Sequence, residues 1–114
     1  MPHDVAAEFE RASIGWEGKL QADEWFFTRL RERLVNTLTP SQALRDIGGV
    51  ADLILCETDA YLRSELAFLL IALARRSDST EMHPALHENW RQVLTRLPRA
   101  AAEEIARWYR REFS

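Results

Sequence analysis

The sequence predicts a compact all-α bundle of six to seven helices around one central buried helix. Gly and Pro number only four each in 114 residues, which favours long helices over a turn-rich β fold. Apolar residues recur at helical spacing, and no stretch alternates with the period of two expected for a strand. Residues 60–74 are apolar on nearly every side, so other elements must surround them. At this length we expect residues 1–114 to form a single helical domain.

The first two predicted helices precede residue 39. Asp4 can cap the first helix, and the stretch Gly15-Trp16-Glu17-Gly18 should break it. Asp23 is expected to cap the second helix. Its core residues recur at helical spacing and are Phe27, Leu30, Leu34 and Leu38.

The next two helices are expected between residues 39 and 57. Thr39-Pro40-Ser41-Gln42 has the residue order of a capping box with Pro at the first helical position. We expect the helix that it opens to end at Gly48-Gly49, because glycine commonly ends helices. A separate apolar helix should then span Val50 to Cys56. The lone cysteine is expected to be a buried small hydrophobic residue.

Three further helices complete the prediction. Thr58 or Asp59 should cap the central helix, which ends before a polar loop at residues 77–80. His83-Pro84 should open the next helix, whose core stripe is Leu86, Trp90, Val93, Leu94 and Leu97. The last helix should start at Pro98, with Ile105, Trp108 and Tyr109 facing inward. Glu103 and Arg107 are spaced as an i, i+4 ion pair.

Residues 50–76 resemble a helical hairpin of the HEAT-repeat kind. Val50 to Glu57 would be its outer helix. Its inner helix would begin at the Asp59 cap and continue through Leu62-Arg63 and an apolar ladder to Leu73. The resemblance implies a hairpin with one helix inside. Since no second copy shows the same detail, a non-repetitive helical bundle is the alternative.

Composition and charge exclude several classes of protein. The formal net charge is −3. Residues 1–60 carry 11 acidic and 6 basic side chains, whereas residues 61–114 carry 7 and 9. This balance argues against direct nucleic-acid binding and allows an acidic surface for a basic partner. With one cysteine, no signal peptide at Met1-Pro2-His3-Asp4 and no apolar run long enough for a membrane span, we expect a cytoplasmic protein without membrane contact.

No constellation of catalytic residues is apparent, so we expect neither an enzyme nor a cofactor. His83 and His87 are spaced to share a metal on a helix, but His83 precedes Pro84 and no third ligand follows at the usual spacing. We therefore interpret them as surface or cap residues and expect no metal. The basic and aromatic residues 107–111 are explained by a solvated helix face beside core aromatics.

Acidic residues near two tryptophans are the most suggestive functional feature. Residues 46–59 contain four acids and no base, and three more acids flank Trp16 and Trp25. Exposed aromatics beside carboxylates are typical of protein-binding hot spots. The candidate partner-binding residues are Trp16, Glu17, Asp23, Glu24, Asp46, Asp52, Glu57 and Asp59. The alternative is that these acids complement helix dipoles and the tryptophans fold inward. We expect arginine at Asp52, Glu57 and Asp59 to abolish binding and leave the melting temperature nearly unchanged.

As a small, acidic, helical chain, and in the stretch from Glu57 to Glu81, the protein resembles immunity proteins of polymorphic, contact-dependent or type VI toxin systems. The resemblance implies that it binds the catalytic domain of a cognate toxin and blocks its active site or access of its substrate. The alternatives are a helical adaptor or regulatory module that holds a peptide or helix, and a metal-dependent enzyme or sensor around His83 and His87.

Overall fold

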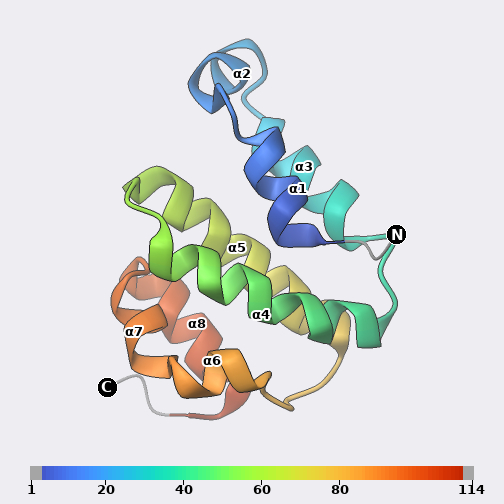
Figure 1. The fold of residues 1–114 in the computed structure, drawn as a ribbon, viewed down its shortest axis with the longest axis vertical. Helices are drawn as coiled ribbons and strands as arrows, with labels where there is room; N and C mark the ends of the chain where they lie inside the picture. The colour runs from blue at the N-terminus through green and yellow to red at the C-terminus, as the bar shows by residue number, and fades with distance from the viewer. Residues whose placement is uncertain (1–3, 112–114) are drawn as a thin grey trace.

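The structure, a computed structural model, describes residues 4–111 and is all-helical within them (Figure 1). It confirms the predicted all-α class, with more and shorter helices than expected at the two ends. The helices are α1 Val5–Ala12, α2 Trp16–Ala22, α3 Phe26–Val35, α4 Pro40–Cys56, α5 Ala60–Ser77, α6 Pro84–Glu88, α7 Trp90–Thr95 and α8 Arg99–Tyr109. Residues 1–3, on which the expectation of no signal peptide partly depends, lie outside the described part.

The helices form three layers. The long helices α4 and α5 are joined by residues 57–59 and pack along each other as the central antiparallel hairpin (Figure 1). Helices α1 and α3 cover one side of this hairpin, and α6, α7 and α8 cover the other. The short helix α2 projects beyond the first layer. The hairpin is therefore the only layer with neighbours on both sides in the described part of the chain.

Helices α3 and α5 run in the same direction. Near their starts, the rings of Phe27 and Tyr61 lie 5.9 Å apart. Near their ends, Nε of Arg76 donates to the carbonyl of Leu38, just after α3, at 2.7 Å. Because residue numbers on both helices rise together, the two helices are parallel.

Helix α8 continues this parallel row on the other side of α5. Arg75 pairs with Glu104 at 2.8 Å, and four residues later Nε1 of Trp108 donates to the carbonyl of Ser79 at 3.0 Å. The row α3–α5–α8 therefore runs in one direction, and α4 packs antiparallel to its central helix. The expected hairpin is present, but its outer helix begins at Pro40 rather than at Val50.

The core confirms the predicted central helix over most of its length. The buried residues of α5 are Leu66, Ala67, Leu69, Leu70, Ile71, Leu73, Ala74 and Ser77. The first turns of the helix are different, because Tyr61 is 41% exposed and Phe68 is 47% exposed. The apolar side chains of its second half are thus mostly buried, Arg75 and Arg76 are exposed, and its first half presents two aromatic rings to solvent.

Three predicted helix caps are present. The Asp4 carboxylate accepts the backbone N–H of Ala7 at 3.2 Å, and that of Asp59 accepts the N–H of Leu62 at 2.9 Å. Thr39 and Gln42 form the complete capping box. These three caps are confirmed because each depends only on residues within one helical turn.

The prediction that a helix ends at Gly48-Gly49 is wrong, because α4 runs through both residues without interruption. The two glycines allow neighbours to approach the helix closely. A Cβ at Gly48 would lie 2.5 Å from Cε1 of His83, and a Cβ at Gly49 would lie 3.1 Å from Cβ of Ala6. Packing of α4 against α1 and α6 therefore explains these glycines, and a helix end does not.

The region expected to be only a break contains α2. Gly15, with φ +69°, turns the chain in the left-handed region that glycine tolerates, and α2 begins at the next residue. Asp23 does not cap α3. It ends α2, and its Oδ1 accepts the N–H of Trp25, the residue directly before α3, at 3.0 Å.

Three expectations for other helices also need correction. The helix predicted from Pro84 onward is divided at Asn89 into α6 and α7, although its predicted core stripe is buried as expected. Glu103 pairs with Arg99 at 2.9 Å, toward the start of α8, rather than with Arg107. Cys56 is exposed, because it lies at the open end of α4.

Among residues 4–111, none of the helices has the length and apolar character needed to cross a membrane.

Candidate protein-binding surface

A stacked pair of aromatic rings joins α2 to the start of α5. The rings of Trp16 and Tyr61 lie 5.0 Å apart and are within 3° of parallel. Trp16 is half-buried by this contact, and Tyr61 keeps 41% of its surface exposed. The stack fixes the projecting helix α2 beside the turn that joins α4 and α5.

Phe27 lies at the centre of the aromatic residues beneath this stack. Its ring is 6.2 Å from that of Trp16, 5.9 Å from Tyr61 and 6.0 Å from Phe9. Phe27 is only 4% exposed. The visible rings therefore rest on a buried aromatic support, which holds them in fixed positions.

A shallow groove of about 160 Å³ lies next to the stack, between α1, α4 and α5. The carboxylates of Glu10 and Glu57 line it together with the apolar side chain of Ile14, which is 72% exposed. Ile14 precedes Trp16 by two residues, and Leu62, which also lines the groove, directly follows Tyr61, so groove and stack are adjacent along the chain. We call this region the hairpin-end surface and define it by Glu10, Ile14, Trp16, Glu57 and Tyr61.

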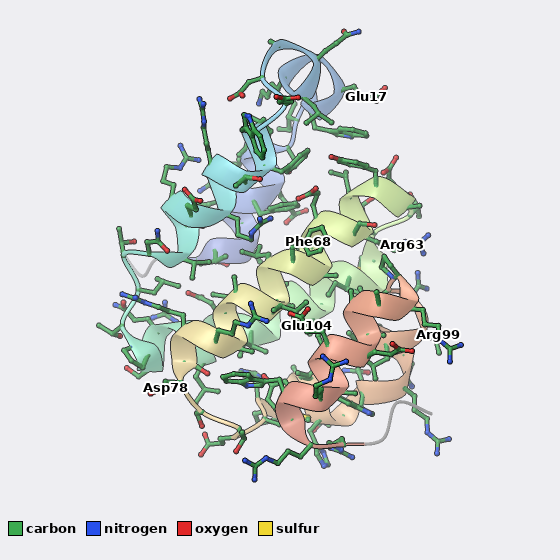
Figure 2. The ribbon with its side chains drawn as sticks, turned by 180° about the vertical axis from the view of Figure 1, so that it is seen from behind. Glu17, Arg63, Phe68, Asp78, Arg99 and Glu104 are labelled. Carbon is green, nitrogen blue, oxygen red and sulfur yellow. The ribbon has the colours of Figure 1, made fainter. Side chains whose placement is uncertain are left out.

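A stripe of two exposed aromatic rings with a mostly buried carboxylate between them continues from this surface along α5. Tyr61, Glu65 and Phe68 are spaced four and three residues apart and so lie on one helix face. Arg31 of α3 lies 5.5 Å from the Phe68 ring centre and 3.6 Å from the Glu65 carboxylate. In Figure 2, Phe68 is seen on α5 where this helix lies beside α3. The stripe is an aromatic and charged seam between two helices.

The charges in this seam perturb two titratable groups. Burial raises the pKa of Glu65, and both Arg31 and a hydrogen bond from Tyr61 partly oppose that rise. The pKa of Tyr61 is raised by burial first and then by the neighbouring Glu65 carboxylate. Both shifts therefore arise first from burial, and the contact between the two side chains modifies them.

The predicted acidic residues do not form one cluster. Glu17, Glu24 and Asp52 are exposed, and Figure 2 shows Glu17 on the projecting helix α2. Asp46 is only 7% exposed and pairs with Arg45 at 3.2 Å, so it is not available to a partner. It also lies about 15 Å before the end of α4 at a rise of 1.5 Å per residue.

Asp23, Glu57 and Asp59 hold the backbone. Asp23 pairs with Arg29 at 3.2 Å and accepts the N–H of Trp25. Glu57 accepts the N–H of Asp59 at 3.0 Å, and Asp59 in turn caps α5. Because of these hydrogen bonds, we now expect arginine at Glu57 and Asp59 to lower the melting temperature instead of leaving it nearly unchanged. Removing a cap costs about 1 kcal/mol.

Sequence reasoning missed Ile14, Tyr61 and Phe68 as exposed residues. The sequence places Tyr61 and Phe68 in the central buried helix, although a charged residue, Glu65, lies on the same helix face between them. Ile14 gave no such signal, because its exposure depends on the turn at Gly15. Of the two tryptophans, Trp25 is the more exposed, at 56%, while Trp16 is held in the stack.

The two histidines considered as metal ligands have different surroundings. Nδ1 of His83 accepts the N–H of Ala85 at 3.0 Å and thereby caps α6, while the ring contacts Gly48. His87 is exposed. Residues 4–111 contain no group of three His, Cys, Asp or Glu side chains placed to hold a metal ion.

A scan against protein-family models, a search of curated proteins and a search of solved structures each found no match to this chain.

Proposed function

We propose that this protein binds a protein partner through the hairpin-end surface and that the partner is the catalytic domain of a cognate bacterial toxin. The observation that carries the proposal is the combination of exposed Ile14 and Tyr61 with the carboxylates of Glu10 and Glu57, drawn from both ends of the sequence segment 10–61. Rigid aromatic anchors beside charged groups are the usual content of a binding hot spot.

The acidic character of this surface supports a basic partner. Glu17 and Asp59 lie next in sequence to the groove and the stack, and both are exposed. Carboxylates at such a surface steer a positively charged domain and raise its association rate. If the partner is a nuclease-like toxin, the carboxylates of this protein would occupy the toxin's sites for nucleic-acid phosphates and block access of its substrate.

The test uses substitutions that do not disturb caps or core. Ile14→Arg and Glu17→Arg change exposed side chains without an ion pair or hydrogen bond in residues 4–111. Each should weaken partner binding by roughly tenfold or more, because a central anchor is lost or the charge is reversed. Glu88→Arg is the matched control. Glu88 is an exposed residue of α6, in the layer on the opposite side of the hairpin, so this variant should bind as the unaltered protein does.

The partner is obtained by affinity capture from the native cells and is then expressed alone and together with this protein. Expression of the partner alone should arrest growth, and co-expression should restore it except with Ile14→Arg and Glu17→Arg. A toxic partner that is neutralised equally by Ile14→Arg and Glu17→Arg would place the interface elsewhere. Failure of this protein to neutralise any captured partner would reject the immunity function.

A helical adaptor is the second candidate. The parallel row α3–α5–α8 favours it, since stacked helices present extended surfaces for peptides and partner helices. The aromatic seam of Tyr61 and Phe68 lies on that row. A captured partner that binds through this seam and causes no growth arrest when expressed alone would favour the adaptor over the immunity protein.

A further inference from the structure

A pocket of about 410 Å³ lies between the second half of α5 and α8, away from the hairpin-end surface. This volume lies within the range of roughly 300–1,000 Å³ typical of small-molecule sites. In Figure 2, Glu104 marks the place where α8 lies alongside α5. The apolar wall of the pocket consists of Leu70, Ile71, Ala74, Ile105 and Trp108. Such a wall suits the apolar body of a ligand.

The walls of the pocket are held in place. Nε1 of Trp108 donates to the carbonyl of Ser79 at 3.0 Å, which ties the loop after α5 to α8. Thr80 of the same loop lines the pocket. The Arg75–Glu104 ion pair joins the two helices a second time, at 2.8 Å. Binding would therefore require little reordering of the chain, and pre-organisation of this kind favours affinity.

The charges around the pocket are mostly positive. Arg75, Arg107 and Arg110 line it, against the single carboxylate of Glu104. Glu104 is already paired with Arg75. Arg107 and Arg110 have no ion pair or hydrogen bond from their side chains within the described part of the chain, and both are exposed. Two guanidinium groups are thus available to a negatively charged ligand group, which guanidinium can bind through two parallel hydrogen bonds.

We infer that this pocket binds a small amphipathic carboxylate, with its apolar body against α5 and Trp108 and its carboxylate at Arg107 and Arg110. An apolar wall alone would accept any hydrophobic molecule. Arg107 and Arg110, which have no partner for their side chains among residues 4–111, select an anion among them. This site is separate from the proposed partner-binding surface and does not depend on the proposed function.

The experiment titrates the full chain with 2-naphthoate and, in parallel, with the uncharged 2-naphthamide, while ¹H–¹⁵N NMR spectra are recorded. We expect saturable shifts at the backbone amides of Ile71 and Ile105 and at the indole N–H of Trp108. The carboxylate should bind roughly tenfold more tightly than the amide.

The double variant Arg107→Gln/Arg110→Gln should reduce affinity for 2-naphthoate to that for the amide. It changes only exposed side chains, so its spectrum should otherwise match that of the unaltered protein. Arg91→Gln, an exposed arginine of α7 outside the pocket, is the control and should leave the affinity unchanged. Absence of saturable shifts at the pocket, equal affinity for acid and amide, or undiminished binding by the double variant would each overturn the inference.

Discussion

Tyr109, the last residue of α8, has a buried side chain whose polar group lowers the stability of the fold. Its side chain is only 6% exposed, and its hydroxyl has no hydrogen-bond partner among the described residues. A buried hydroxyl without a partner costs about 1–3 kcal/mol, because the water that it loses is not replaced. Burial also raises the pKa of Tyr109 to about 12. The ring contributes to the core, and the hydroxyl does not.

Tyr109→Phe should therefore be at least as stable as the unaltered protein at neutral pH, and more stable than it in alkali. The unfolded phenol loses its proton near its ordinary pKa of 10.0, while the folded one keeps it to about 12. The unfolded state then binds fewer protons, so stability falls as pH rises above about 10, by about 1 kcal/mol near pH 11. Phenylalanine removes this contribution.

The measurement is the free energy of unfolding in urea between neutral pH and about pH 11. Tyr61→Phe is the control, since Tyr61 is 41% exposed and its contribution should be smaller. An unchanged alkaline loss of stability in Tyr109→Phe would contradict the burial of this hydroxyl.

At the scale of single elements, α4 contains two adjacent glycines that predict a helix end but instead allow close packing of neighbouring residues. Adjacent glycines usually weaken a helix, and one of them commonly ends it. Here the helix continues, because the absent Cβ of Gly48 leaves room for the His83 ring. That ring is held by its hydrogen bond to the N–H of Ala85. Gly48 thus allows α4 to pack closely against the start of α6.

Gly48→Ala should destabilise the protein by roughly 1–3 kcal/mol, since the new Cβ would lie 2.5 Å from Cε1 of His83. Gly18→Ala in α2 is the matched control. It has no heavy atom within 4 Å of the added Cβ, so it should stabilise by about 0.5–1 kcal/mol. Both are measured by urea unfolding.

His83→Ser removes the ring and keeps a side-chain oxygen that can cap α6. In that background Gly48→Ala should cost much less than in the unaltered protein. A Gly48→Ala variant with unchanged or increased stability would mean that the His83 ring does not pack against α4 as described.

At the scale of the whole molecule, the layers differ in how strongly they are held. The α4–α5 hairpin has helices on both sides, whereas α2 buries no residue fully and is attached through the half-buried ring of Trp16. Local stability in proteins follows the density of buried contacts. The molecule should therefore open from α2 inward.

Trp16→Ala should release α2 without unfolding the rest of the chain, and Leu73→Ala should weaken the whole molecule. Leu73 is fully buried in α5, and such a substitution costs about 2–5 kcal/mol. Hydrogen exchange distinguishes the two results. The first variant should lose protection within residues 16–22 alone, while the second should lose it in α4, α5 and α8 together. Equal loss across the chain in Trp16→Ala would show that α2 is an integral part of the core.

The sequence by itself determined the all-α class, the buried second half of α5 and the caps at Asp4, Thr39 and Asp59. These features depend on periodicity and on contacts within one helical turn, and both can be read along the chain.

Only the tertiary structure decided which acidic residues are accessible, why α4 passes through its glycines and which aromatic rings face solvent. Asp46 is buried because neighbouring parts of the fold cover it. Phe68 is exposed because they leave nearly half of it open to solvent. The pocket between α5 and α8 likewise joins side chains about thirty residues apart. Such proximity is set by how helices pack together, and spacing along the chain does not encode it.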